Sequence, residues 1–212
     1  MTKQSTAIDL YFWMTPNGQK ISIMLEELGV PYTTHFVNIG EGEQFKPEFL
    51  KISPNNKIPA IVDPNGPDGM PITVFESGAI LKYLAQKFNK FYPTETRAQV
   101  KVDEWLSWQI AGLGPMVGQL AHFARFAKEK IPYAIERYHT ETKRLYGVLD
   151  QQLEGQDYIA GEFSIADMAT IGWMRGYKMQ EIDIADYPNV GKWIERMLAR
   201  DGVKKGFAVG QD

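Results

Sequence analysis

The tetrapeptide Thr15-Pro16-Asn17-Gly18 combines hydrogen-bond donors with residue types that favour turns. It follows an apolar, strand-like run at residues 8–12 and precedes a stretch with a helical pattern. The apolar residues of that stretch have the spacing of one buried helical face: Ile21, Met24, Leu25 and Leu28. A helix N-terminus stabilises negative charge, and a thiolate is such a charge. Because the chain contains no cysteine, a thiolate held at this turn must arrive with a ligand.

A second pair of chemically useful residues, Glu76 and Ser77, stands at the start of another predicted helix. We expect Ser77 to cap this helix while its hydroxyl and the neighbouring backbone N–H groups hold a carboxylate. Glu76 can bind an ammonium group. The alternative is an ordinary serine cap beside a solvated glutamate. The glutamate favours the ligand site, because a carboxylate beside an anion site needs a cation to balance it.

Short strands and helices must position both groups. The run at residues 8–12, the helix that Gly29 ends, and a strand at Thr33–Asn38 form a βαβ unit, so the two strands should be parallel. A short helix at Pro47–Lys51 comes next, and the Asn65–Gly69 turn cluster then separates two hairpin strands. We expect these hairpin strands at Ile58–Val62 and Ile72–Phe75.

From about Thr94 onward the strand signals stop and a helical period dominates. We predict one long helical run to about Arg125, with a kink or break at residues 112–115, where two glycines and a proline occur. Ser164 and Asp167 form a capping box at the start of a later helix. The shift in pattern predicts two domains, an α/β domain over residues 1–90 and an all-α domain over residues 95–212.

Composition excludes several classes of protein. Apolar residues make up 44% of the 212 residues, which is typical of a globular protein, and the net charge of −3 gives no basic face for nucleic acid. Without cysteine there is no disulfide and no cysteine-ligated zinc, and His35, His122 and His139 lack metal-ligand spacing, so we expect no metal. Residues 1–6 show no signal-peptide pattern and no apolar run is long enough to span a membrane, which predicts a cytoplasmic protein.

Four motifs together resemble the cytosolic glutathione transferase superfamily, over nearly the whole chain. They are Thr15-Pro16-Asn17-Gly18, Ser53-Pro54-Asn55-Asn56-Lys57-Ile58-Pro59-Ala60, Phe75-Glu76-Ser77-Gly78-Ala79-Ile80 and Ser164-Ile165-Ala166-Asp167. The first motif and the stretch from Trp108 to Met116 resemble the bacterial nu class, relatives of the fungal nitrogen regulator. The resemblance implies a thioredoxin-like domain followed by an all-helical domain, a homodimer, and glutathione as bound co-substrate.

The resemblance assigns the sulfur of glutathione to Thr15, Asn17 or Tyr11. A hydrogen bond to the charged form lowers the pKa of a thiol. Thr15 and Asn17 cannot act as bases near neutral pH, so their role would be electrostatic stabilisation rather than proton abstraction. Tyr11 matches the strand position of the catalytic hydroxyl in classes that use tyrosine, and ranks third because the nu class does not rely on it. The order of Thr15 and Asn17 stays open.

The other candidate ligand contacts are also carried over from the resemblance. Ile58 and Pro59 would form a cis peptide whose backbone pairs with the cysteinyl unit of glutathione, and Glu76 and Ser77 would bind its γ-glutamyl end. The remaining candidates are Gln44, Asn56 and Lys57 around the glycyl end and Arg137 from the helical domain. A solvated surface position is the alternative for Lys57, and an ion pair with Glu141 is the alternative for Arg137.

The predicted activity is glutathione-dependent reduction of a small disulfide, with peroxide reduction as a side activity. Thiol–disulfide exchange by bound glutathione needs no cysteine on the protein. Two alternatives remain: conjugation of glutathione to an electrophile, and a binding or regulatory protein on the same fold.

Overall fold

The computed structural model describes residues 7–211, and this part of the chain divides into two compact units. One unit runs to Lys90 and takes in the stretch from Arg200 onward, whereas the other spans Phe91–Ala199. From the sequence we expected residues 95–212, including the stretch from Arg200 onward, to form the all-α domain. The expectation about a signal peptide falls on residues 1–6, outside the described part. Within residues 7–211 no helix is both long and apolar enough to cross a membrane.

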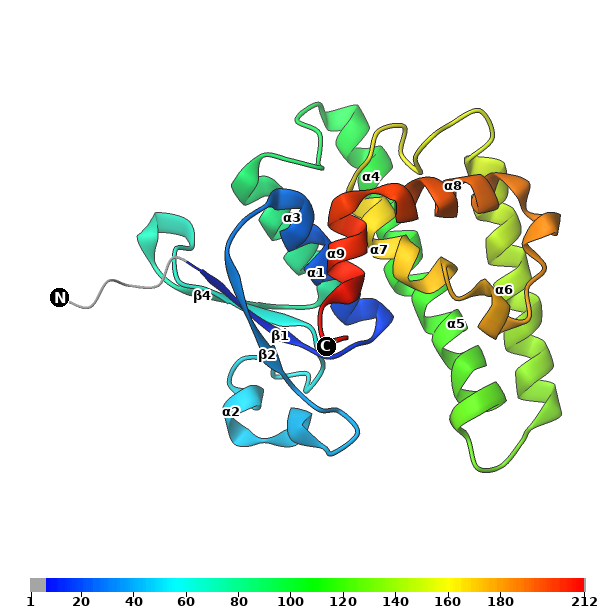
Figure 1. The fold of residues 1–212 in the computed structure, drawn as a ribbon, viewed down its shortest axis with the longest axis horizontal. Coiled ribbons are helices and arrows are strands. Elements are labelled where there is room, and N and C mark those ends of the chain that lie inside the picture. Colours follow the sequence, from blue (N-terminus) through cyan, green and yellow to red (C-terminus); the bar gives the residue numbers. More distant parts are fainter. Residues whose placement is uncertain (1–6, 212) are drawn as a thin grey trace. The chain divides into compact units, whose positions relative to one another are not determined.

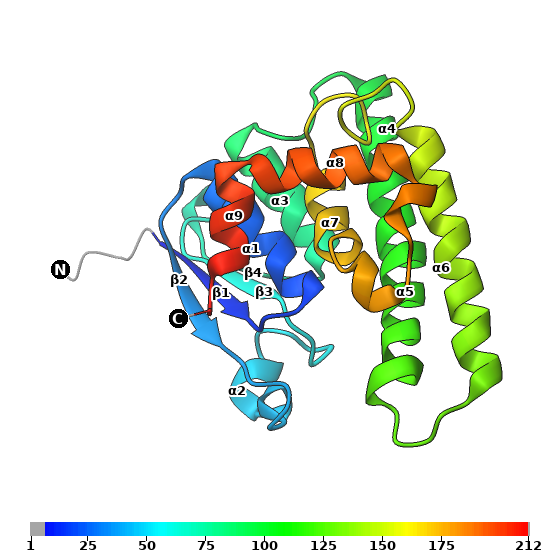
Figure 2. The ribbon, with the colours of Figure 1, turned by 45° about the vertical axis from the view of Figure 1, so that its right-hand side comes forward.

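The first unit contains a sheet with strand order β2-β1-β3-β4 (Figure 2). The strands are β1 (Ile8–Phe12), β2 (Tyr32–Phe36), β3 (Ala60–Asp63) and β4 (Ile72–Phe75). β1 pairs with β2 in parallel, which confirms the βαβ unit, and β3 pairs antiparallel with both β1 and β4, which confirms the hairpin. β3 begins at Ala60, two residues later than expected, because Pro59 has no N–H for a ladder.

The two faces of this sheet carry different helices. Side chains alternate along a strand, so the buried Leu10 and Phe12 point to one face and Tyr11 to the other. Phe12 faces Gly18 in α1 (Pro16–Leu28), which packs beside α3 (Ser77–Phe88). On the opposite face, Tyr11 packs with Phe49 of α2 (Pro47–Leu50), which follows η1 (Glu43–Phe45). The beginnings of α1 and α3 flank the site described below.

α9 (Asp201–Ala208) lies beside α1 and completes the first unit (Figure 1). The helices approach closely at Gly206, where a Cβ atom would lie 2.5 Å from Cα of Ile23. The Ser22 hydroxyl donates to the carbonyl of Gly206 at 2.7 Å. Arg200 binds both carboxylate oxygens of Glu27, at 2.9 and 2.8 Å. The C-terminal helix is therefore held to α1 by backbone contact and by charge.

A buried ion pair joins β3 to α3. Asp63 is fully buried and accepts hydrogen bonds from the ammonium of Lys87, the hydroxyl of Tyr83 and the backbone N–H of Asn65. Burial raises the pKa of the Asp63 carboxyl, but these donors outweigh it and hold the pKa below its usual range. Asp63 therefore stays ionised in the folded protein.

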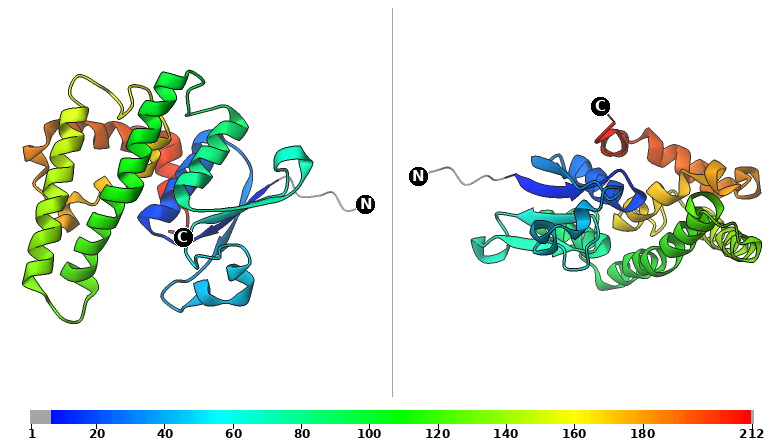
Figure 3. Two further views of the ribbon diagram at one scale, coloured as in Figure 1. Left: turned by 180° about the vertical axis from the view of Figure 1, so that it is seen from behind. Right: turned by 90° about the horizontal axis from the view of Figure 1, so that it is seen from below.

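The second unit is helical, and Figure 3 shows α6 running alongside the long α4–α5 rod. Its helices are α4 (Thr96–Trp108), α5 (Gly114–Ala121), α6 (Pro132–Gln152), α7 (Ile165–Met174) and α8 (Pro188–Ala199). The shorter segments of the two units are η2 (Pro67–Gly69), η3 (Gln109–Leu113), η4 (His122–Phe126), η5 (Tyr177–Gln180) and η6 (Ile184–Asp186). η3 is π-helical, so the break predicted at residues 112–115 is a π segment within a continuous rod.

The predicted capping box at the start of α7 is confirmed. Ser164 accepts from the N–H of Ala166, and the carboxylate of Asp167 accepts from the N–H of Ser164 at 3.0 Å. Asp167 is fully buried and also accepts from the Ile159 N–H at 3.0 Å and the indole N–H of Trp193 at 2.9 Å. Asp167 thus joins α7, α8 and the preceding loop.

Candidate functional site

The N-terminus of α1 places the first group of candidate residues. Thr15 is the N-cap, and its hydroxyl oxygen accepts from the N–H of Gly18 at 3.2 Å. Pro16 is the first helical residue, where its missing N–H costs nothing. Gly18 packs so tightly that a Cβ atom would lie 2.2 Å from the carbonyl oxygen of Trp13. This close approach fixes the turn and puts Asn17 in the first helical turn, half-buried.

The loop before β3 forms a second wall. The Ile58–Pro59 peptide is cis, as expected. Ser53 is fully buried and its hydroxyl donates to the carbonyl of Lys57 at 2.8 Å, which ties the loop back on itself. Asn55 extends from the same loop and donates from Nδ2 to Oε1 of Glu76 at 3.2 Å.

The junction of β4 and α3 forms the third wall. Glu76 has φ 69° and ψ 116°, a backbone conformation that costs a residue with a side chain about 1–3 kcal/mol. Such costs are retained most often at binding and catalytic sites. The expectation that Ser77 caps α3 is wrong: Glu76 occupies the cap position without a side-chain cap bond, and Ser77 is the first helical residue. The Ser77 hydroxyl is therefore not used by the helix end.

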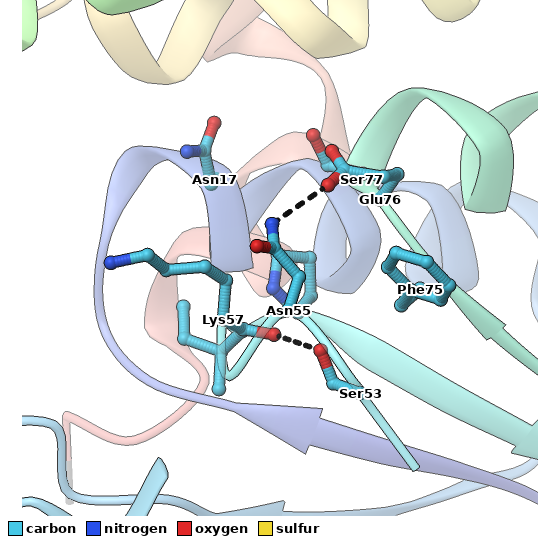
Figure 4. Close-up of a pocket in the computed structure, with 9 residues that line it drawn as sticks. Asn17, Ser53, Asn55, Lys57, Phe75, Glu76 and Ser77 are labelled. Atoms are coloured by element: carbon cyan, nitrogen blue, oxygen red, sulfur yellow. Dashed lines mark hydrogen bonds between the residues drawn. The ribbon is translucent and has the colours of Figure 1, made fainter. Parts of the chain in front are cut away.

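These three walls enclose one cavity of about 160 Å³, which lies entirely within the first unit. Its lining residues are Asn17, Ser53, Asn55, Lys57, Ile58, Pro59, Phe75, Glu76 and Ser77. Figure 4 shows Asn55 and Glu76 directed toward each other, while the ammonium of Lys57 extends to the opposite side. The cavity thus offers an anionic group, a cationic group and neutral donors at separate places, which suits a zwitterionic ligand.

Lys20 is a residue at this site that sequence reasoning missed. Its side chain is 2% exposed, and Nζ donates to the hydroxyl oxygen of Ser77 at 3.2 Å. Burial lowers the pKa of the Lys20 ammonium to about 7, against the opposing effect of the Glu76 carboxylate. A signal existed in the sequence, since Lys20 stands four residues before Met24 and so lies on the buried face of α1.

Tyr11 does not line this cavity. It lines a second cavity of about 240 Å³ together with His35, Phe49 and Glu43, among others. Its ring stacks on His35 with centroids 4.9 Å apart. Burial, and then the Asp9 carboxylate, raise the pKa of the Tyr11 hydroxyl, which disfavours a tyrosinate.

Four other candidates also lie outside the lining of the first cavity: Thr15, whose hydroxyl accepts from Gly18, and Gln44, Asn56 and Arg137. Gln44 is half-buried in η1 and donates from Nε2 to the carbonyl of Ile39 at 3.3 Å. Asn56 adopts φ 47° and its backbone N–H donates to the carbonyl of Ser53. Arg137 is an exposed residue of α6 in the second unit. Arg144 binds Glu141, the alternative partner considered for Arg137, at 2.7 and 2.8 Å.

Comparison with known proteins agrees with this fold. A model of the glutathione S-transferase N-terminal domain matches residues 15–87, and a model of the C-terminal domain matches residues 115–201. The chain belongs to the glutathione S-transferase family, which confirms the resemblance drawn from the four motifs. Within residues 7–211 no group of three or more His, Asp or Glu side chains is placed to hold a metal ion.

Among individual relatives, the disulfide-bond oxidoreductase YfcG of Escherichia coli is 53% identical over 206 residues, covering 96% of each chain. A glutathione transferase of Burkholderia graminis, crystallised with two glutathione molecules per subunit, is 45% identical with a TM-score of 0.94, over 97% of this chain and 89% of its own. A glutathione transferase of Pseudomonas putida, crystallised with one glutathione disulfide per subunit, is 40% identical with the same TM-score of 0.94, over 99% and 94%.

Proposed function

We propose that this protein is a glutathione-dependent reductase of small disulfides, with peroxide reduction as a side activity. The observation that carries the proposal is one cavity that joins the N-terminus of α1 to Glu76 and Ser77, in a chain without cysteine. The name of the relative YfcG and the glutathione disulfide held by the Pseudomonas putida relative support the same chemistry.

In this proposal the cavity binds glutathione by its charges. Ser77 and the free N–H groups of α3 take the γ-glutamyl carboxylate, and Glu76 takes the neighbouring ammonium. The backbone of Ile58 pairs with the cysteinyl unit, and Lys57 offsets the glycyl carboxylate. Gln44 and Asn56 are further proposed contacts to the glycyl end of glutathione. Arg137 is a proposed contact from the helical domain.

Asn17 and Thr15 would act on the sulfur. The Asn17 amide and the N–H groups of the first turn of α1 are donors that favour a thiolate over a thiol, which lowers the pKa of the bound thiol. Thr15 already accepts from Gly18 and keeps its hydroxyl proton available as a donor. Both residues stabilise charge and neither removes a proton.

Glutathione alone supplies the two electrons that reduce the disulfide. The bound thiolate attacks one sulfur of the disulfide, forming a mixed disulfide and releasing one substrate thiolate, which takes a proton from water. A second glutathione thiolate attacks the glutathione sulfur of the mixed disulfide and releases the other substrate thiolate. Two glutathione molecules are oxidised to glutathione disulfide, and the substrate disulfide is reduced to two thiols.

The test compares glutathione-dependent reduction of 2-hydroxyethyl disulfide with conjugation of an aryl halide on the same preparation. We expect disulfide reduction to be much the faster activity. Fast conjugation with slow reduction would instead identify an electrophile-conjugating transferase. Glutathione binding with neither activity would identify a binding or regulatory protein.

The proposal also includes a homodimer in a reducing compartment such as the cytoplasm. The dimer is supported by the resemblance to the transferase superfamily, and the compartment by the lack of cysteine in the chain. Light scattering after size-exclusion chromatography tests the dimer, and a mass of one chain at micromolar concentration would contradict it.

A further inference from the structure

Lys20 is a buried cation directly behind the wall of the candidate glutathione site. Its side chain is 2% exposed, and its ammonium lies 3.2 Å from the hydroxyl oxygen of Ser77, a residue that lines the cavity. Burial of an ammonium in a protein interior is costly, so a lysine is rarely retained in such a place without a role. The contact with Ser77 indicates what that role is.

The Ser77 hydroxyl can connect Lys20 to a ligand. A hydroxyl has one donor proton and two acceptor lone pairs. When a lone pair accepts from Lys20, the proton of Ser77 is free to point into the cavity. Polarisation by the ammonium strengthens that proton as a donor. A carboxylate bound there would thus feel the charge of Lys20 through one hydroxyl group.

The elements that pack against α1, the helix of Lys20, include α3, α9 and β1. Glu76, at the start of α3, is a charged group that acts on Lys20 and favours its ammonium form. On the α9 side, Arg200 is bound to Glu27. On β1, Asp9 is bound to His35 at 2.7 Å. The remaining charged side chains of α9 are exposed: Asp201, Lys204 and Lys205.

We propose that Lys20 is a positioning residue that fixes Ser77 as a donor to the γ-glutamyl carboxylate and takes up a proton when that carboxylate binds. The inference rests on the proposed glutathione site and deepens it. Glu76 then serves two cations, the ligand's ammonium in the cavity and Lys20 behind it.

Ligand binding is coupled to the protonation of Lys20 by the charges of the two groups. Burial lowers the pKa of Lys20 to about 7, so the pKa lies close to neutral pH and both the neutral and the ammonium form are accessible there. A carboxylate at Ser77 brings a negative charge close to Nζ and raises this pKa. Binding therefore draws a proton onto Lys20, and affinity falls as pH rises through the pKa of the free protein.

The test uses S-methylglutathione, which has no thiol to titrate. Isothermal titration in phosphate and in Tris, buffers with different ionisation enthalpies, measures the protons taken up on binding. We expect wild type to take up a large fraction of a proton at pH 8 and to bind about tenfold more weakly at pH 8 than at pH 6. The Lys20→Met variant should take up fewer protons on binding and should bind S-methylglutathione more weakly at pH 6. Its affinity should also lose most of the dependence on pH.

Two controls sharpen the comparison. Lys90→Met removes an exposed lysine from the same unit and should leave the proton uptake unchanged. Lys20→Arg keeps a permanent positive charge, so it should bind without the Lys20 proton uptake. The ligand's own groups titrate equally in all variants and cancel in the differences.

A measurement on wild type alone covers the case in which Lys20→Met does not fold. In protein labelled with ¹³C-lysine, one Cε resonance should titrate well below the usual lysine pKa of about 10.4. Saturating S-methylglutathione should raise that pKa. The proposed role of Lys20 is overturned if the ligand leaves the lysine titration unchanged. It is also overturned if the Lys20→Met variant takes up as many protons on binding as wild type. Failure of wild type to bind S-methylglutathione at any pH overturns the proposed function itself.

Discussion

The contact between α1 and α9 at Gly206 makes a sharp stability prediction for Gly206→Ala. A Cβ at this position would lie 2.5 Å from Cα and 2.6 Å from the nitrogen of Ile23, which are backbone atoms that no rotamer change can move. Ordinary carbon–carbon contacts are about 3.5–4.0 Å. The two helices would have to separate by about 1 Å, which also stretches the bond from Ser22 to the Gly206 carbonyl.

Opposing contributions set the size of the effect. Forced overpacking costs about 1–3 kcal/mol, and loss of the Ser22 hydrogen bond costs about 1 kcal/mol. Alanine in place of a helical glycine returns about 1 kcal/mol. The expected net loss is about 1–3 kcal/mol, which for a chain of this length corresponds to a fall in melting temperature of about 2–12 °C.

Gly147→Ala is the matched control. Gly147 also lies inside a helix, α6, but a Cβ there would meet its nearest neighbour, Tyr187, at 3.9 Å, an ordinary contact. This variant should therefore gain about 0.5–1 kcal/mol. Both variants and wild type are compared by thermal unfolding followed by circular dichroism. A Gly206→Ala protein as stable as Gly147→Ala would refute the reasoning, because helix propensity would then outweigh the close approach to Ile23.

Further predictions concern the sulfur contact and two buried carboxylates. Asn17→Ala should lower kcat/KM for disulfide reduction about a hundredfold, whereas Tyr11→Phe should stay near wild type; the reverse pattern of losses would show that the tyrosine activates the thiol. Asp167→Ala leaves buried N–H donors unpaired and should lower the free energy of unfolding, measured in urea, by about 2–5 kcal/mol. A loss of less than about 1 kcal/mol would show that Asp167 acts only as an ordinary helix cap. Lys87→Met leaves Asp63 buried without its cation and should cost about 2 kcal/mol at pH 7, after allowance for the partial exposure of Lys87. Since the pKa of Asp63 is lowered by folding, its contribution is present above about pH 4 and lost as pH falls further, so the stability of Lys87→Met should depend less on pH in acid than that of wild type.

Local patterns were enough to predict most of the elements. The alternation in residues 8–12, the turn at Thr15 to Gly18 and the glycine after Leu28 each specify one element, and the structure has β1, α1 and a left-handed Gly29 there. The capping box is equally local, because Ser164 and Asp167 bind each other's backbone within one helical turn. The cis peptide and the transferase fold came from the combination of motifs rather than from any single one.

Features that depend on side-chain direction or on contacts between distant residues were harder to predict from the sequence. The motif at Ser53 to Lys57 contains two adjacent asparagines, and only the folded loop shows that Asn55, not Asn56, lines the cavity. The cap expected of Ser77 failed because Glu76 adopts a positive φ, which an isolated sequence does not reveal. The contact of Lys20 with Ser77 joins residues 57 positions apart.

The pairing of α9 with α1 has a consequence for protein synthesis. The ribosome completes α1 at Leu28 but adds α9 only from Asp201, and the Glu27–Arg200 pair spans 173 positions. At about 5–20 residues per second, the face of α1 that binds α9 stays uncovered for roughly 10–35 s on every chain. The second unit, inserted between the two parts of the first, can fold during this interval. The candidate glutathione site therefore lies on a unit that is complete only after the stretch from Arg200 to Ala208 has been synthesised.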